Sequence, residues 1–331
     1  MAPVVRAAEE ESRATLEFRG RVLLPAQARR PDRRMTVSLV QVGTSFAAQT
    51  RPDSRGRFRF RKLQPGTYSL EILIPGTGAI LRTVELTPSF ADARGRVEKE
   101  FLFDQDALQR LARPIPQGLV SVRELSIPRK ARNEYGKARN ALRKRDVEGA
   151  VRRLEKAVEL APQFMEAVNN LGMIRFQQRE YAEAERYFRN ALELEPEAFE
   201  PLVNLGGTLL ALGRVEEAIE VCGRAQSARP QDPLANAQLG LAYFLAGDDE
   251  SALNYLLLTQ ELDPVHFTNP QLPLARIYLR HSEEEAALEE LQDFLRLRPD
   301  SPEAESVRAL VQRIEQALQA EAGGAPSVRA P

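Results

Sequence analysis

Few residues in this chain have the type and spacing that chemistry requires. Both histidines, His266 and His281, lie in the second half, and His281 opens the segment HSEE, where a histidine and a glutamate stand three residues apart. These are metal-ligand types, but no suitably placed third ligand accompanies them, so we predict no metal site. The glycine-serine motif of hydrolases, a phosphate-binding glycine loop and a cysteine/histidine pair are absent from the sequence. We therefore predict no enzyme, no catalytic residues and no cofactor.

The composition is that of a globular protein of two or three domains. The chain has 331 residues, of which 43% are hydrophobic and 28% charged. No apolar run approaches the roughly 20 residues that cross a bilayer, so we expect no membrane insertion. The single cysteine, Cys222, excludes an internal disulfide and is best read as a small buried hydrophobe.

Charge is distributed unevenly along the chain. There are 21 Lys and Arg against 14 Asp and Glu up to residue 125, and 25 against 33 after it. The two parts either attract one another or face different partners.

The first part alternates with a period of two residues, which is typical of strands. Turn residues separate seven runs, and short strands with such breaks predict a small antiparallel sandwich. They cover Thr15–Leu24, Met35–Val42, Ser45–Thr50, Arg57–Arg61, Thr67–Ile74, Ile80–Leu86 and Val97–Phe103.

One of these runs, RFRFR, sets Phe58 and Phe60 between Arg57, Arg59 and Arg61. Neighbouring side chains of a strand point to opposite faces, so the phenylalanines enter a core only if the arginines point outward. The arginines are then a solvated face or a patch for an anionic glycan, a nucleic acid or the acidic second half. Nucleic acid is disfavoured, because base stacking needs aromatic rings on the basic face.

The pattern Gly56-x-Phe58-x-Phe60, followed by Leu63-x-Pro65-Gly66-x-Tyr68, resembles the carboxypeptidase regulatory-like domain, a transthyretin-like sandwich. The resemblance covers about residues 14–104. In that family the pattern marks the fold and not a catalytic site.

From Ala131 onward the sequence repeats itself. Prolines close successive units at 162, 196, 230, 264 and 299, with Leu-Gly pairs at 171, 205 and 239 and alanines at 150, 184, 218, 252 and 287. This pattern resembles the tetratricopeptide repeat, in which small residues let two antiparallel helices approach and proline ends the second. The resemblance implies five stacked helix pairs and a terminal covering helix.

The predicted fold is therefore an N-terminal antiparallel β-sandwich followed by an α-solenoid of about five helix pairs with a capping helix. We predict a flexible N-terminus over 1–13, the sandwich over 14–104, a proline-containing linker over 105–130, the solenoid over 131–320 and a disordered tail over 321–331.

The resemblance implies that the first helix of each repeat lines a concave groove for a peptide. The corresponding residues are Tyr135, Arg139, Asn169, Asn170, Met173, Gln177, Val203, Asn204, Gly207, Ala237, Gln238 and Leu241. Asn170, Asn204 and Gln238 recur in consecutive repeats, so they are either an amide ladder for a peptide backbone or ordinary surface polar residues. A clamp for the carboxylate of heat-shock chaperones is unsupported, since only Asn170 fits it.

We predict a non-catalytic scaffold or adaptor that binds a peptide or protein segment in the groove. The alternative is a sandwich that binds carbohydrate of the cell envelope, tethered by the solenoid. The pair of domains resembles bacterial envelope or secreted proteins, which favours a periplasmic or secreted location. The N-terminus lacks the apolar core of a signal peptide, which leaves a cytoplasmic location as the alternative, unless the start has been assigned too far downstream.

Overall fold

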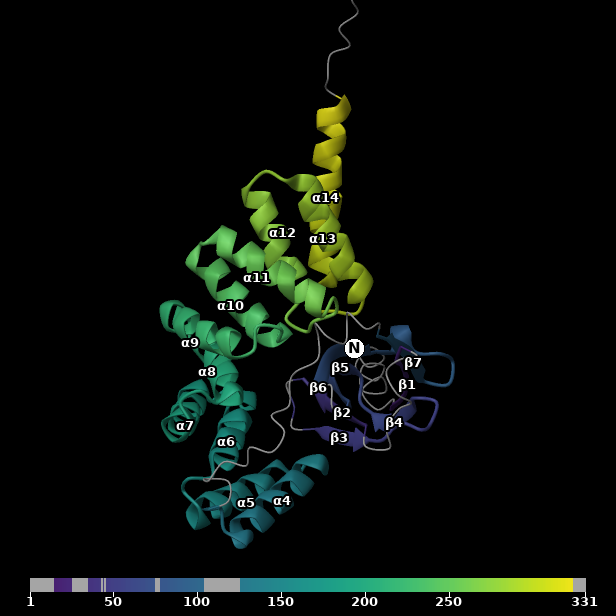
Figure 1. Cartoon of the computed structure of the whole chain (residues 1–331). Helices are drawn as coiled ribbons and strands as arrows, with labels where there is room; N and C mark the ends of the chain where they lie inside the picture. Colours follow the sequence, from purple (N-terminus) through teal and green to yellow (C-terminus); the bar gives the residue numbers. More distant parts are fainter. Residues whose placement is uncertain are drawn as a thin grey trace, which may run out of the picture.

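The computed structural model describes residues 15–25, 35–42, 44, 46–74, 78–103 and 126–323. The predicted flexible N-terminus, residues 105–125 of the predicted linker and the end of the predicted tail lie outside these ranges. Within them, strands come first and helices follow (Figure 1).

In the described part of the chain, seven strands form two sheets that share one hydrophobic core. One sheet has the order β4-β1-β7 and the other β3-β2-β5-β6. The strands are β1 (Leu16–Leu23), β2 (Thr36–Gln41), β3 (Ala47–Thr50), β4 (Arg57–Leu63), β5 (Gly66–Ile74), β6 (Gly78–Leu86) and β7 (Arg96–Leu102), with a short 3-10 helix, η1 (Pro88–Phe90), between the last two.

The two-residue period determines which side chains of β4 enter the core. Phe58 and Phe60 are buried between the sheets while Arg57, Arg59 and Arg61 are exposed. The Phe58 ring packs edge-on against Phe60 at 6.0 Å between centroids. The row of arginines is thus the outward half of an alternating strand.

One strand pair departs from the antiparallel prediction. β1 runs parallel to β7, with Glu17 opposite Arg96 and Leu23 opposite Leu102, whereas the other pairs are antiparallel. Alternation specifies the faces of a strand and not its direction. The direction of β7 follows from the chain passing from β6 in one sheet to the other sheet, a long-range feature that the pattern does not encode.

Helices fill the second part of the chain in antiparallel pairs, followed by a longer final helix. They are α4 (Arg129–Arg143), α5 (Val147–Leu160), α6 (Met165–Gln177), α7 (Tyr181–Leu194), α8 (Phe199–Ala211), α9 (Val215–Ala228), α10 (Pro233–Ala246), α11 (Asp249–Leu262), α12 (Gln271–Arg280), α13 (Glu284–Leu297) and α14 (Ala304–Gly323). The predicted fold, strands followed by a solenoid of helix pairs and a covering helix, is confirmed.

The repeated glycines lie where the two helices of a pair touch. A Cβ atom at Gly172 of α6 would stand 2.6 Å from the ring of Phe188 on α7, and one at Gly206 of α8 would stand 2.5 Å from Sγ of Cys222 on α9. A side chain at either position forces the helices apart, so these glycines permit the close helix approach that the repeat pattern predicts.

The repeated alanines are likewise small residues that are fully buried in the solenoid. Ala218 of α9 is fully buried within the cluster that joins α8 to its neighbours. We expect Ala218→Leu to overpack this contact and to lower the free energy of unfolding by roughly 1–3 kcal/mol. Urea denaturation measures the difference. The control is Ala211→Leu, because Ala211 is exposed at the end of α8; equal stability of both variants would contradict the packing.

The fifth repeat begins irregularly. Pro270 precedes α12 and Pro273 lies in its first turn, where no backbone N–H is needed for an intrahelical bond. α12 has 10 residues, whereas α4, α6, α8 and α10 have 13 to 15. The prolines delay the helix, and the segment between α11 and α12 therefore remains a set of turns.

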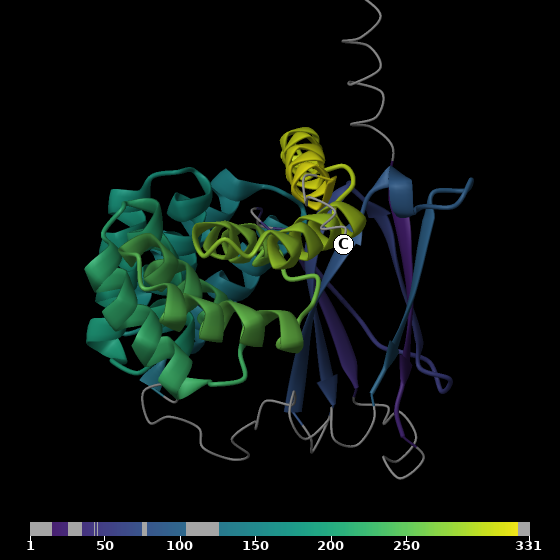
Figure 2. The same cartoon turned by 90° about the horizontal axis from the view of Figure 1, so that it is seen from above.

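The solenoid curves around the four-stranded sheet (Figures 1 and 2). Residues of α4 and α6 face β2 and β3 at one end of the arc, and the turns after α11 and α13 contact β6 at the other. The three-stranded sheet lies on the side away from the helices (Figure 2). None of the helices in the described ranges is long and apolar enough to cross a membrane.

Candidate functional site

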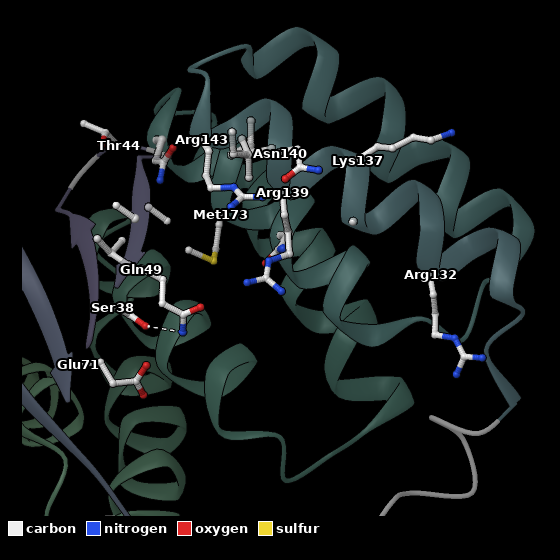
Figure 3. A pocket seen from close by; sticks show the side chains of 18 of the residues that line it. Ser38, Thr44, Gln49, Glu71, Arg132, Lys137, Arg139, Asn140, Arg143 and Met173 are labelled. Carbon is white, nitrogen blue, oxygen red and sulfur yellow. Dashed lines mark hydrogen bonds between the residues drawn. The ribbon is translucent and has the colours of Figure 1, made fainter. Parts of the chain in front are cut away.

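A cleft of about 910 Å³ separates the four-stranded sheet from the first two helix pairs. One wall is the outer face of the sheet, with Val40 of β2, Ala47 and Gln49 of β3 and Glu71 of β5. The opposite wall is formed by α4 and α6 (Figure 3). Both parts of the chain therefore contribute to one hollow.

The wall from α4 is mostly polar. Six of its eight lining positions, 132, 133, 136, 139, 140 and 143, follow the helical period and carry three arginines, two asparagines and a glycine, and the other two are Lys137 and Leu142. Figure 3 shows Arg139 and Arg143 reaching into the space beside Met173, toward the strands. The cleft is consequently basic on its helical side.

Four of the predicted groove residues line this cleft. They are Arg139, Asn170, Met173 and Gln177. The side-chain amide of Asn170 also donates to Oη of Tyr135 at 3.1 Å, which joins the first two repeats. Tyr135, Asn169 and the predicted residues of the third and fourth repeats do not line it.

The remaining amides contact each other or the backbone of the solenoid. Asn204 donates through Nδ2 to Oδ1 of Asn169 at 3.0 Å. Gln238 lies against Gly207, where a Cβ atom would stand 2.7 Å from its Nε2. Their first observable role is thus to connect one repeat to the next, and their use by a peptide stays a prediction.

The sequence did not predict the contact at the other end of the arc. Asp263, in the turn after α11, accepts a hydrogen bond through Oδ2 from the backbone N–H of Thr83 at 2.8 Å. Arg82 donates to the carbonyl of Leu262 at 3.0 Å. Since β6 is an edge strand, the helical turn covers backbone groups that would otherwise be unpaired.

A buried ion pair completes this contact. The guanidinium of Arg298, after α13, contacts the carboxylate of Glu85, and both side chains are 9% exposed. Arg298 also donates through Nη2 to the carbonyls of Val265 at 2.9 Å and His266 at 3.2 Å. The pair therefore joins the sheet, the fifth repeat and the turn before it.

The two anchors occupy equivalent places in the repeat. Asp263 and Arg298 each directly precede the proline that ends their unit, and they bind Thr83 and Glu85, which share one face of β6. The sequence does show opposite charges at this position in the last two repeats. It does not identify their partners, which lie 180 and 213 residues away along the chain.

His266 is buried beside this contact. Its Nδ1 lies 2.8 Å from Oγ1 of Thr268, and its ring packs against Phe267. Burial lowers the pKa of His266 to about 3, because the charged imidazolium would be removed from water. The histidine is therefore neutral in the folded protein near pH 7.

The second histidine, His281, lies on the surface, and the single cysteine, Cys222, is buried. His281 is exposed, with Nε2 at 3.0 Å from Oδ2 of Asp249. Burial raises the pKa of Cys222 to about 12, which keeps the thiol protonated. Across the described ranges, no group of three or more His, Cys, Asp or Glu side chains could hold a metal ion.

The arginines of β4 face a surface of mixed charge. Arg57 lies 2.8 Å from Asp53, and Arg61 lies 3.5 Å from Glu17. Neighbouring β1 and β7 add further opposite charges, with Arg21 at 3.4 Å from Glu100. The row is thus largely compensated on the three-stranded sheet.

Residues 135–189 and 170–233 match the model of the tetratricopeptide repeat family. Residues 135–233 thus contain tetratricopeptide repeats. No curated protein sequence matches the chain.

Several solved structures resemble part of the chain. MamA (41-end) from Desulfovibrio magneticus RS-1 is 22% identical, with a TM-score of 0.48 over 54% of this chain and 99% of that one. YrrB, described as a TPR protein with an unusual peptide-binding site, is 24% identical, with a TM-score of 0.47 over 54% and 92%. PilW, a type IV pilus biogenesis factor, is 20% identical, with a TM-score of 0.48 over 60% and 96%.

Proposed function

We propose that this protein is a non-catalytic interaction scaffold that binds an extended segment of a partner protein in the cleft between the four-stranded sheet and helices α4 and α6. The observation that carries the proposal is the lining of the cleft, which combines the first helices of two repeats with the outer face of the sheet. Clefts between two structural units are preferred places for ligands.

The neighbouring strand supports an extended ligand. β3 lies at the edge of its sheet and pairs with β2 on one side only. The backbone groups on the other side of such a strand can pair with an added peptide strand. Asn140, Asn170 and Gln177 offer amide donors and acceptors on the opposite wall.

Apolar side chains in the cleft supply a second kind of contact. Val40 on the sheet is 39% exposed and Met173 on α6 is 37% exposed. An apolar residue of a partner that buries both gains roughly 25 cal/mol for each Å² removed from water. Methionine adapts its shape to varied ligands.

The proposal includes a family assignment for the strand region and a location for the protein. The resemblance to the carboxypeptidase regulatory-like domain rests on four residues that are buried in the core, as expected of a motif that marks a fold: Phe58, Phe60, Leu63 and Tyr68.

We propose that the protein works in the periplasm or outside the cell, on the resemblance of its domain pair alone. Detection of the native protein only in a cytoplasmic fraction would contradict that location.

The peptide-binding function can be tested with a displayed library of random peptides selected on the full-length protein. We expect Met173→Trp, which places a larger side chain in the cleft, to weaken binding of the selected peptides at least tenfold, or by about 1.4 kcal/mol. Fluorescence anisotropy measures their affinity.

Leu257→Trp is the matched control, because Leu257 is also exposed but lies on α11, away from the cleft. Failure to select any peptide, or equal binding by both variants, would remove the proposed function.

A further inference from the structure

We propose that the segment bound in this cleft is acidic, with its carboxylates held by Arg132, Arg139 and Arg143. The inference rests on the proposed function and adds the chemical class of the partner.

The cleft carries an excess of positive charge. Its lining residues include four basic side chains and one acidic, Glu71. Lys137 is compensated by Glu134, with Nζ at 2.6 Å from Oε1. The three arginines form no ion pair within the part of the chain that the structure describes, and all three are exposed.

Arginines elsewhere on the solenoid differ from these three. Arg153, Arg175, Arg189 and Arg214 each have a carboxylate oxygen within 3.0 Å. The acidic second part of the chain therefore supplies partners to many of its arginines but not to those on the cleft side of α4. A partner's carboxylates can meet that charge in bidentate geometry.

The spacing of the arginines favours an extended ligand over a small anion. Eleven residues separate the first from the last, which is about 16 Å along a helix that rises 1.5 Å per residue. An extended segment of about five residues covers this distance at 3.3 Å per residue. A single phosphate or carboxylate could contact only one end of the row.

The lining also favours protein over nucleic acid. No aromatic ring is present among the residues that line the cleft, and single strands are held largely by stacking on such rings. Val40 and Met173 instead provide apolar contact beside the charges. The occupant that fits is an acidic peptide segment with apolar residues between its carboxylates.

The test uses the full-length protein and two triple variants of equal charge change. One is Arg132→Ser with Arg139→Ser and Arg143→Ser, and the other is Arg57→Ser with Arg59→Ser and Arg61→Ser. The probes are a short labelled peptide of Asp and Glu with leucines between them, its Asn and Gln counterpart, and a labelled oligothymidylate. Anisotropy is measured at low and at physiological salt.

We expect the acidic peptide to bind at least tenfold tighter than its neutral counterpart, to lose that advantage in the cleft variant, and to keep it in the strand variant. Weaker binding at higher salt supports the same assignment, since exposed charges are screened over about 8 Å at physiological salt. If both triple variants lost the tighter binding of the acidic peptide, that binding would depend only on the net charge of the protein, and the inference would be overturned.

The remaining outcomes separate the two proposals. Equal binding of the acidic and neutral peptides, with loss on Met173→Trp, would overturn the acidic partner and leave the peptide cleft intact. Binding of neither peptide, together with an empty library selection, would overturn both. Tighter binding of the oligothymidylate than of the acidic peptide, lost in the cleft variant, would assign the cleft to nucleic acid instead.

Discussion

Replacing Arg298 with alanine should detach the four-stranded sheet from the fifth repeat and lower the stability of the protein by roughly 3–5 kcal/mol. The substitution leaves the carboxylate of Glu85 buried without its cation, since that side chain is 9% exposed. It also removes the donors to the carbonyls of Val265 and His266. Thermal denaturation and small-angle scattering measure the loss, the second as a larger radius of gyration.

Paired substitutions distinguish the buried charge from simple packing. Glu85→Ala should lower the stability by a similar amount, because it leaves the guanidinium of Arg298 buried without its anion. The double variant Arg298→Met with Glu85→Leu should recover most of the stability, since replacing both members of a buried ion pair by apolar residues is often close to neutral. If either single variant were as stable as the original protein, the ion pair would not hold the two parts together.

Acidification should destabilise the protein through His266. In the folded state burial lowers the pKa of His266 to about 3, whereas the unfolded value is 6.5. Between these values the unfolded chain binds a proton that the folded chain does not. The stabilisation that comes from keeping His266 neutral is fully present above pH 6.5. Below pH 6.5 the free energy of unfolding falls by about 1.4 kcal/mol for each pH unit, down to about pH 3.

Burial keeps the ring of His266 neutral, and the hydrogen bonds of the ring are compatible with the neutral form. In the neutral ring, Nδ1 can accept a hydrogen bond from the hydroxyl of Thr268 at 2.8 Å and a longer one from the backbone N–H of Thr268 at 3.4 Å.

His266→Asn isolates the effect, because its amide oxygen replaces the Nδ1 acceptor without titrating. Urea unfolding should show a shallower loss of stability between about pH 6.5 and pH 5 in the variant. Other groups also titrate, and burial raises the pKa of the neighbouring Asp263, which acts in the opposite direction. The quantity that decides is therefore the difference in slope between the two proteins, and equal slopes would show that His266 is not the group responsible.

The outcome for the candidate site differs among its residues. Arg139, Asn170, Met173 and Gln177 were assigned to the groove from the repeat register and do line the cleft. Ser38, Val40 and Gln49, on the opposite wall, could not be assigned, because the sequence does not state that the sheet faces α4. The groove was expected within the solenoid alone, but seven of the nineteen residues that line the cleft come from the strand region.

The sequence by itself determined the elements of this protein. The 34-residue spacing of the prolines, the Leu-Gly pairs and the two-residue alternation of strands such as β4 are local patterns, and each reflects contacts made within one repeat or one strand pair.

Only the tertiary structure decided how the two parts meet. Thr83 with Asp263 and Glu85 with Arg298 are separated by 180 and 213 residues, and the parallel pairing of β1 with β7 joins the two ends of the strand region. Nothing in a local period specifies such partners, because they depend on the curvature that five stacked repeats accumulate and on which exposed edge that curve brings into reach.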